Sequence, residues 1–234
     1  MLPIRDRMPS RSFPTVTVVL ILVNAAVFAW QLLVLGRGGE GALQQAVFQY
    51  GVVPARVAAD PVAPLTLLTF VTSMFMHGGF MHIGGNLLYL WIFGNNVEDV
   101  LGSLWFTAFY FLAGFAASAA QVIASWTSDV PAIGASGAIA GVLGAYLLFF
   151  PRARVDTLVL FGWFYRIAAL PAVLVLGLWF VLQFLSGTLS VGADAGTGGV
   201  AYWAHVGGFV AGLVLCLPWL GRARALGRRA LYRY

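Results

Sequence analysis

Charged residues are scarce in this chain, and lysine is absent. Only 9% of its 234 residues are charged, whereas about a quarter of the residues of a soluble domain are charged. Hydrophobic residues make up 61% of the chain, and the mean hydropathy is +0.90. Most side chains must therefore face lipid or other apolar helices. This excludes an ordinary soluble domain and predicts a polytopic membrane protein.

Cysteine is almost absent as well. Cys216 stands alone inside an apolar run, which excludes an intramolecular disulfide and predicts a buried apolar role. No signal-peptide cleavage site follows the first apolar run, which is long enough to span a membrane. The net charge of +5 rests on thirteen arginines, and these lie outside the apolar runs, where they orient a membrane protein. The expected partner is thus the lipid bilayer rather than nucleic acid.

Apolar runs recur along the chain and predict an all-α membrane protein with a six-transmembrane-helix bundle. The expected spans are Val16–Leu35, Gly79–Val97, Leu104–Ala124, Ser136–Phe150, Ile167–Leu185 and Ala201–Leu220. Residues 1–14 form an N-terminal arm, residues 15–220 the membrane domain and residues 221–234 a basic tail. The long stretch from Gly36 to Phe75 is expected to form short helices at the membrane surface, such as Ala42–Tyr50.

The arginines predict the orientation of this bundle. An even number of spans places both termini on one side of the membrane. All of the arginines except Arg37 and Arg56 fall on that side, in the arm, in the tail and between the fourth and fifth spans. The positive-inside rule therefore predicts that both termini are cytoplasmic.

Several polar side chains lie in or beside the expected spans: His77, His82, Asn86, Ser136 and His205. Polar groups at membrane depth are costly and often functional, although serine, asparagine and histidine also join helices in membranes. Measured from the inner ends of their spans, Ser136, His82 and His205 lie about 21–22 Å up, with Asn86 one turn deeper. This common height favours a single site.

Small residues predict which spans meet. Gly137 and Gly141 form a stripe on the fourth span, and Gly208 and Gly212 form one on the sixth, a spacing that lets helix backbones approach closely. His205 shares the face of the second stripe. If the two stripes meet, this histidine becomes a neighbour of the serine that opens the fourth span.

Such a pair has the chemistry of acyl transfer. A serine hydroxyl becomes a useful nucleophile when a neutral histidine takes its proton. None of the eight acidic residues falls in the middle of a span, so Ser136 and His205 are expected to form a dyad. His82 and Asn86, four residues apart on one helix face, can both donate hydrogen bonds to an oxyanion, as can the backbone N–H of Ser136.

The motifs around these residues resemble those of rhomboid intramembrane serine proteases over essentially the whole chain. GxSG stands at Gly134–Gly137, HxxxN at His82–Asn86 and AHxxG at Ala204–Gly208, with Gly212 continuing the last. The resemblance implies that Ser136 is the nucleophile and His205 the general base, that His82, Asn86 and the Ser136 amide bind the oxyanion, and that Gly134, Gly137, Gly141, Gly208 and Gly212 are structural.

The same resemblance implies the substrate class: transmembrane helices of other membrane proteins, cut near their outer end, with no metal or cofactor. A chain without lysine and rich in alanine and glycine suggests a prokaryotic cell membrane. The oligomeric state stays open. The glycine-rich loop from Ser186 to Gly199 is expected to help admit substrate between the second and fifth spans.

Some positions depart from the family pattern. Leu68 and Thr69 stand where many members carry a Trp-Arg pair in the first loop, and Ala140 stands where some carry an aromatic residue against the catalytic histidine. These departures leave open how the loop and the histidine are held. His77 matches a histidine often found at the start of the second span, and we interpret it as structural.

The sequence leaves four alternatives to weigh. A proteolytically silent relative that binds membrane clients usually lacks the serine or the histidine. A metal or haem site is disfavoured because there is no HExxH motif and because His77 and His82 face different sides of a helix. A transporter or channel usually has charged residues at the midplane or broken helices in repeated halves, and neither is evident in this sequence. An aspartyl protease needs two aspartates within its spans, and the expected spans contain none in their middle.

Overall fold

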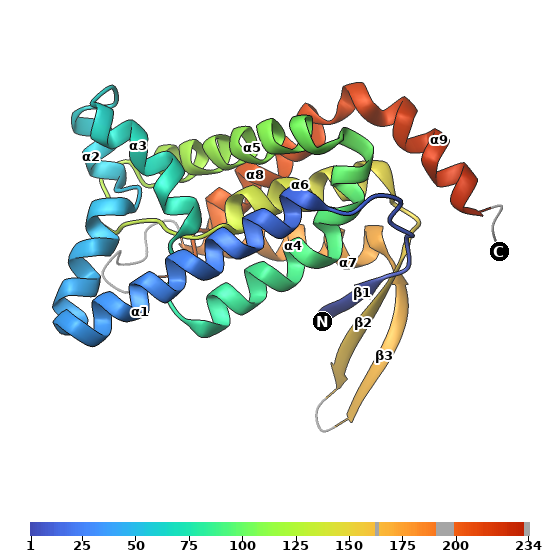
Figure 1. Ribbon diagram of the computed structural model, residues 1–234, viewed down its shortest axis with the longest axis horizontal. Coiled ribbons are helices and arrows are strands. Elements are labelled where there is room, and N and C mark those ends of the chain that lie inside the picture. Colours follow the sequence, from blue (N-terminus) through green and yellow to red (C-terminus); the bar gives the residue numbers. More distant parts are fainter. Residues whose placement is uncertain (162–163, 191–198, 232–234) are drawn as a thin grey trace.

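The computed structural model describes residues 1–161, 164–190 and 199–231. Helices lie side by side along the long axis of the molecule, and a small β-sheet projects sideways from the end near the N-terminus (Figure 1). Within the described residues, α1 (Thr15–Tyr50), α5 (Ser103–Ala124) and α7 (Ala172–Ser190) are each long and apolar enough to cross a membrane. The chain is an integral membrane protein.

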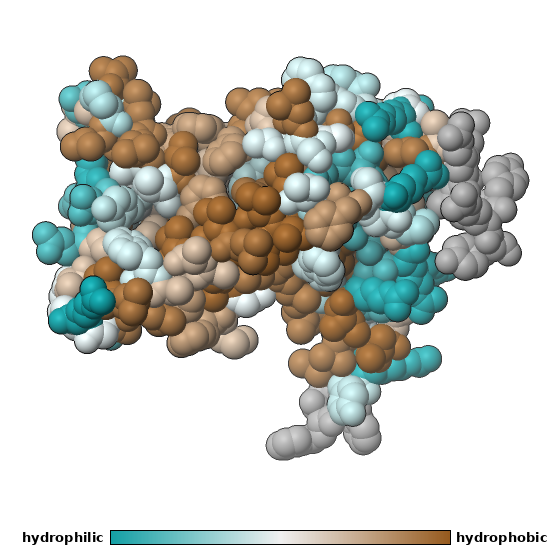
Figure 2. All heavy atoms as spheres, in the orientation of Figure 1, coloured by the Kyte–Doolittle hydropathy of each residue, from teal (hydrophilic) through white to brown (hydrophobic). Residues whose placement is uncertain are grey.

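The outer surface agrees with a membrane environment. On the face seen in Figure 2, apolar side chains gather over α1 and α4 (Phe80–Leu101), and polar ones collect at the end that holds the sheet and the start of α9 (Leu220–Leu231). On α1 the exposed side chains include Leu22 at 62% and Leu33 at 57%. Large exposed apolar side chains over such an area are stable in lipid rather than in water.

Helix α1 is longer than the expected first span, and a glycine divides it. Gly39 has φ 71° and ψ −171°, a backbone conformation that glycine adopts without a steric cost. The residues after it form the helical segment that was expected at Ala42–Tyr50. Two short helices follow, α2 (Pro54–Ala59) and α3 (Pro64–Thr72), and each begins with a proline at its first position. The turn η1 (Ser73–Phe75) then leads into α4.

Helix α6 (Ser136–Phe149) forms the centre of the bundle, where almost all of its side chains are buried. A Cβ on Gly208 would collide with the carbonyl oxygen of Gly137, and one on Gly212 would collide with that of Gly141. The two small-residue stripes therefore lie against each other, with the backbones of α6 and α8 (Tyr202–Leu215) in contact. Only glycine permits this approach.

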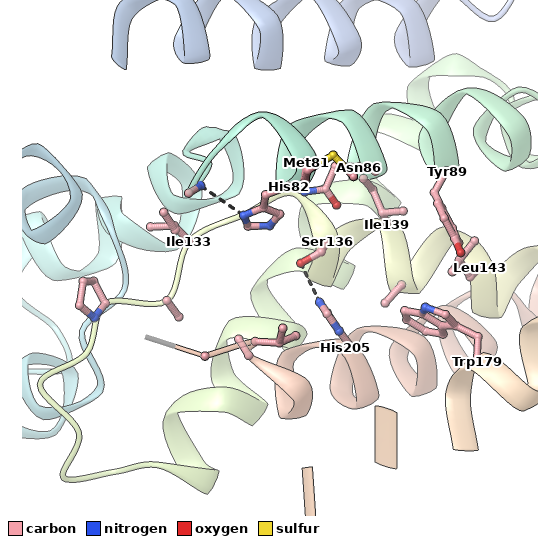
Figure 3. A pocket seen from close by; sticks show the side chains of 18 of the residues that line it. Met81, His82, Asn86, Tyr89, Ile133, Ser136, Ile139, Leu143, Trp179 and His205 are labelled. Atoms are coloured by element: carbon pink, nitrogen blue, oxygen red, sulfur yellow. Dashed lines mark hydrogen bonds between the residues drawn. The ribbon is translucent and has the colours of Figure 1, made fainter. Parts of the chain in front are cut away.

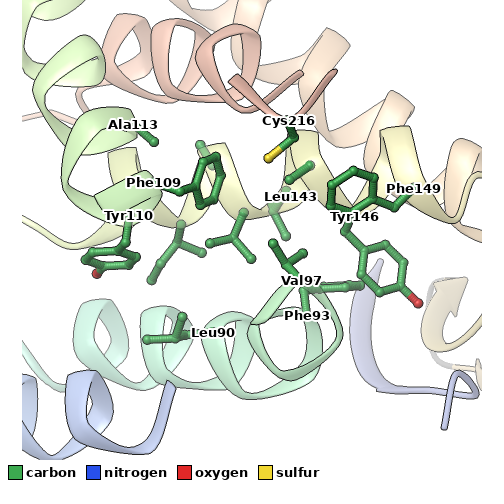
Figure 4. Close-up of a cluster of buried hydrophobic side chains, with 14 of the residues drawn as sticks. Leu90, Phe93, Val97, Phe109, Tyr110, Ala113, Leu143, Tyr146, Phe149 and Cys216 are labelled. Carbon is green, nitrogen blue, oxygen red and sulfur yellow. The ribbon is translucent and has the colours of Figure 1, made fainter. Parts of the chain in front are cut away.

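One apolar core holds α4, α5 and α6 together (Figure 4). Phe93 of α4 packs edge-on against Tyr146 of α6, with ring centroids 4.9 Å apart. Leu143 of α6 and Tyr110 of α5 are fully buried in the same core. Cys216 is buried there too. The helix that carries the serine is thus fixed on several sides.

A three-stranded antiparallel sheet corrects the all-α expectation. It contains β1 (Leu2–Asp6), β2 (Arg154–Phe161) and β3 (Phe164–Pro171) in the order β1-β2-β3. The expected fifth span started at Ile167, but this residue lies in β3 and pairs with Leu158. Short apolar runs look alike in strands and buried helices, which explains the error. Helix α7 starts at Ala172 instead.

Helix α8 is also shorter than the predicted sixth span, Ala201–Leu220. Helix α8 ends at Leu215, and the 3-10 turn η2 (Leu217–Trp219) separates it from α9. The two helical segments are bent by 42°. Pro218 lies in this turn, and a proline cannot continue the hydrogen-bond ladder of a helix. α8 qualifies as a membrane span only together with the segment that follows it.

Acidic side chains fasten the start of α1 and the N-terminal arm to the bundle. The Glu98 carboxylate, at the end of α4, accepts hydrogen bonds from the N–H groups of Val16 (3.0 Å) and Thr17 (2.9 Å) and from the Ser103 hydroxyl (2.8 Å). In β1, the Asp6 carboxyl accepts a hydrogen bond of 2.9 Å from the Tyr146 hydroxyl of α6. Burial raises the pKa of Asp6 to about 6. Its folded environment therefore favours the neutral acid.

Candidate active site

Ser136 is the first residue of α6, directly after a tight turn. Gly134 makes this turn with φ 128°, and its N–H donates a hydrogen bond of 2.8 Å to the carbonyl oxygen of Ser73. A Cβ at Gly134 would also lie 2.7 Å from Nε2 of His82. Glycine is needed here both for the backbone conformation and for space. The turn presents the serine side chain to a cavity.

The structure brings Ser136 and His205 together. Their Oγ and Nε2 atoms are 2.8 Å apart, and His205, on α8, is 8% exposed (Figure 3). The other ring nitrogen, Nδ1, lies 2.6 Å from Oε1 of Gln183 on α7. Because an amide oxygen only accepts hydrogen bonds, Nδ1 carries the ring hydrogen and Nε2 accepts the serine hydroxyl. This is the tautomer that a general base needs.

His82 and Asn86 project from α4 toward the same cavity (Figure 3). Nδ1 of His82 accepts a hydrogen bond of 3.2 Å from the N–H of Gly78, so its Nε2 carries the hydrogen and has no acceptor among the residues that the structure describes. Asn86 is 7% exposed, and its Nδ2 has no hydrogen-bond partner among the described residues. A buried amide without an acceptor is a donor available to a ligand.

These side chains share one cavity of about 760 Å³. Its lining is mainly apolar, as is usual for sites that bind organic groups. At one end Tyr89 of α4, Leu143 of α6 and Trp179 of α7 lie together (Figure 3). The lining also includes Ile133 and the chain from Gly199 to Ala201. The cavity volume lies in the range of about 300–1,000 Å³ that is usual for ligand pockets.

The comparisons with known proteins identify the family. The family model of the rhomboid domain matches residues 64–222, which is well over half of the chain. The chain belongs to the rhomboid family. It is similar to Rhomboid protein 1, mitochondrial, of Saccharomyces cerevisiae, with 35% identity over 92 residues, covering 38% of this chain and 27% of the relative.

Two further relatives carry protease names. Rhomboid-type serine protease 2 of Emericella nidulans is 28% identical over 170 residues, which cover 73% of this chain and 30% of that protein. Rhomboid protease GluP of Bacillus subtilis is 42% identical over 77 residues, which cover 33% of this chain and 15% of that protein. The chain thus spans less than a third of the length of these relatives.

In this rhomboid, two site residues were missed from the sequence: Trp179 and Gln183, both on α7. The Trp179 ring lies 5.7 Å from the His205 ring between centroids, with an angle of 35° between the planes. An aromatic ring therefore lies against His205 although Ala140 offers none. One signal was available, because Gln183 is the only amide side chain in the apolar fifth run.

The first loop is held without the Trp-Arg pair. Thr69 is buried, and its hydroxyl donates a hydrogen bond of 2.6 Å to the Thr66 carbonyl, whereas Leu68 is 52% exposed. The Thr72 hydroxyl donates one of 2.7 Å to the carbonyl of Tyr50, at the end of α1. Side-chain contacts of α3 with its own backbone and with α1 therefore fix the loop.

His77 and its backbone connect α1 to the start of α4. Gln31 of α1 donates through Nε2 to the His77 carbonyl and accepts through Oε1 from the His77 N–H, both at 2.9 Å. The His77 ring is 2% exposed and packs edge-on against His82 at 5.1 Å. This ring contact supports the position of His82. Among the described residues, no three His, Cys, Asp or Glu side chains are arranged to hold a metal ion.

Proposed function

We propose that this rhomboid is an intramembrane serine endopeptidase that acts through Ser136 and His205. The observation that carries the proposal is the 2.8 Å contact between the serine Oγ and Nε2 of His205, in a ring whose Nδ1 faces an acceptor. A nucleophile within hydrogen-bond reach of a base, which is itself oriented by a third group, is the arrangement of a serine hydrolase.

The reaction follows from the positions of these groups. Ser136 Oγ attacks the scissile carbonyl carbon while its proton passes to Nε2 of His205. The carbonyl oxygen becomes an oxyanion, and the donors that face it are Nε2–H of His82, Nδ2–H of Asn86 and the N–H of Ser136, which opens α6 and has no intrahelical acceptor. His205 then protonates the leaving amine. In the second half of the reaction a water molecule attacks the acyl-enzyme while its proton passes to Nε2 of His205, which then returns the proton to Ser136 Oγ.

The proposed substrates are transmembrane segments of other membrane proteins. Helix α6 has 14 residues and is about 21 Å long, shorter than a hydrocarbon core of about 30 Å, so Ser136 lies below the membrane surface. A substrate helix must unwind to place a carbonyl there, because helical carbonyls are already hydrogen-bonded. Cleavage near the outer end of the substrate follows from this depth, because the peptide groups that unwinding frees can still be hydrated there.

We further propose that α4 and α6 complete a six-span bundle with both termini in the cytoplasm of a prokaryotic cell. These two helices differ from a typical span for physical reasons. α4 carries the polar site residues His82 and Asn86, and α6 is short and shielded from lipid by its neighbours. The arginines of the arm and the tail support the cytoplasmic assignment. Residues 15–220 would then form the protease domain.

The test is cleavage of a model single-span substrate co-expressed with the wild-type chain, Ser136→Ala or His205→Ala. Cleavage by the wild type and none by either variant is expected. Undiminished cleavage by either variant would refute the dyad. Substrate that co-purifies with the wild type but is never cut would instead support a proteolytically silent rhomboid that binds membrane clients.

A further inference from the structure

Helix α7 holds the His205 ring with two side chains that lie one turn apart. Trp179 and Gln183 are separated by four residues, so they share a face of α7. The Trp179 ring packs against the imidazole at a tilt of 35°, with the ring centroids 5.7 Å apart, and Oε1 of Gln183 lies 2.6 Å from Nδ1. One contact fixes the plane of the ring and the other fixes its rotation within that plane.

The orientation of the Gln183 amide determines which nitrogen of His205 carries the hydrogen. With Oε1 toward Nδ1, the hydrogen sits on Nδ1, and Nε2 is free to take the proton of Ser136. With the amide NH₂ toward Nδ1, the ring would carry its hydrogen on Nε2 and would donate to the serine instead. Only the first arrangement makes His205 a base.

We propose that Gln183 is a positioning residue, which keeps His205 in the base-competent tautomer and takes the place that an aspartate has in a catalytic triad. The inference rests on the proposed function and deepens it. It assigns to the fifth membrane helix a part in catalysis that acts through the base rather than through contact with the substrate.

An amide is the better group at this depth for a physical reason. A carboxylate within a membrane costs about 3 kcal/mol or more in insertion free energy, whereas a neutral amide fixes the tautomer without burying a charge. The titratable side chains that line the cavity are His82, Tyr89 and His205. No acidic side chain is among the lining residues that the structure describes. In this part of the chain, Nδ1 of His205 therefore faces the amide oxygen of Gln183 rather than a carboxylate.

The rest of α7 keeps Gln183 in place. Phe180 stacks on Phe209 of α8, with centroids 4.6 Å apart, and Phe184 packs edge-on against Trp203 of α8 at 5.9 Å. These aromatic contacts flank Gln183 on both sides along the helix. α7 and α8 therefore hold a fixed register, which positions the amide opposite Nδ1.

The experiment compares Gln183→Met and Gln183→Glu with the wild type in the full chain, reconstituted in liposomes with a fluorogenic transmembrane peptide. Methionine keeps the length and the apolar stem but lacks the acceptor. It is expected to lower kcat about 10- to 100-fold, the effect of one lost hydrogen bond to a charged group, with KM within about twofold. Leu182→Met, on the lipid-facing side of the same helix (52% exposed), is the matched control and should keep full activity.

The pH profile of Gln183→Glu is a measurement that a purely structural role of Gln183 would leave unchanged. This substitution keeps the acceptor and adds a negative charge that stabilises the imidazolium. The acidic limb of the pH profile of kcat/KM should then move to higher pH by about one unit or more. At pH values above its acidic limb, Gln183→Glu should be more active than Gln183→Met.

Two results would overturn the inference: wild-type kcat in Gln183→Met, or an acidic limb in Gln183→Glu that coincides with that of the wild type. The second arm decides the question even if methionine prevents folding. Failure of the proposed function looks different, because the wild-type chain itself would then show no cleavage that depends on Ser136.

Discussion

Replacing Gly208 with alanine tests whether the backbone contact between α6 and α8 sets the distance between serine and histidine. The added methyl group would meet the carbonyl oxygen of Gly137, the residue after Ser136, at a separation that real Cβ atoms essentially never show. Because the obstacle is backbone, no side chain can rotate away. The helices must separate by about 1 Å to restore an ordinary contact.

That separation falls on the site itself, since His205 lies one helical turn from Gly208. A hydrogen bond of 2.8 Å between Oγ and Nε2 would lengthen to about 3.8 Å, beyond the range of a hydrogen bond. A misplacement of about 1 Å costs about 100-fold in rate. Overpacking costs about 1–3 kcal/mol of stability. We therefore expect a large loss of cleavage and a smaller loss of folding free energy.

The assay measures both quantities on the same preparation: cleavage of a transmembrane peptide in liposomes, and unfolding in detergent by denaturant titration. Gly84→Ala is the control, because a Cβ at Gly84, on α4, meets nothing within 4 Å. It should stabilise the helix by about 0.5–1 kcal/mol and leave cleavage unchanged. Wild-type cleavage by Gly208→Ala would refute the claim that this contact sets the site geometry.

Three further changes have defined outcomes. Burial raises the pKa of Asp6 from 3.8 to about 6. The stabilisation from its neutral form is therefore complete below pH 3.8 and is lost as the pH rises through 6, by about 3 kcal/mol in all. The free energy of unfolding of Asp6→Asn, measured from pH 4 to 8, should lack that fall, and a pH dependence like that of the wild type would contradict this account. Gly134→Ala places a side chain at φ 128° and against the His82 ring, so it should cost about 1–3 kcal/mol and abolish cleavage; retained cleavage would show that this turn is adaptable. Glu98→Gln leaves donors of Thr17 and Ser103 without their charged acceptor and should lower the free energy of unfolding by about 1–3 kcal/mol. Cleavage at low temperature should stay normal; lost cleavage in a folded variant would reveal a coupling to the site that no contact among the described residues shows.

The positions of several helices were predictable from the sequence because apolar helices are read from uninterrupted apolar runs. The expected span Leu104–Ala124 differs from α5 by one residue at its start, and Ser136–Phe150 differs from α6 by one at its end. The rhomboid family prediction is confirmed by the family match over residues 64–222. Its basis was three motifs on three different helices, and that combination is far more specific than a single GxSG.

The sheet was not predictable by the same reasoning. β2 and β3 are only eight residues each, and the second half of β3 is apolar, so hydropathy alone assigned it to the next span. Pairing partners decide such cases, and β1 lies about 150 residues away in the chain from its partner β2. The structure also shows that the N-terminal arm is part of the folded unit, which its polar composition did not indicate.

Trp179 and Gln183 show a second limit. A hydropathy run tells that a segment is helical but not how the helix is rotated about its axis. Which face of α7 meets His205 depends on aromatic contacts with Phe209 and Trp203, and these pairs are distant in the chain. The expected loop from Ser186 to Gly199 is in part the end of α7, up to Ser190, and its residues 191–198 lie outside the described residues.

The most direct test of the central claim is chemical labelling of the serine. Membranes that contain the wild-type chain are treated with a fluorophosphonate, and the modified peptide is identified by mass spectrometry. A base-activated Ser136 predicts a single adduct on its Oγ, absent in Ser136→Ala and strongly slowed in His205→Ala. An unlabelled wild type, or equal labelling of wild type and His205→Ala, would contradict an activated serine at the start of α6.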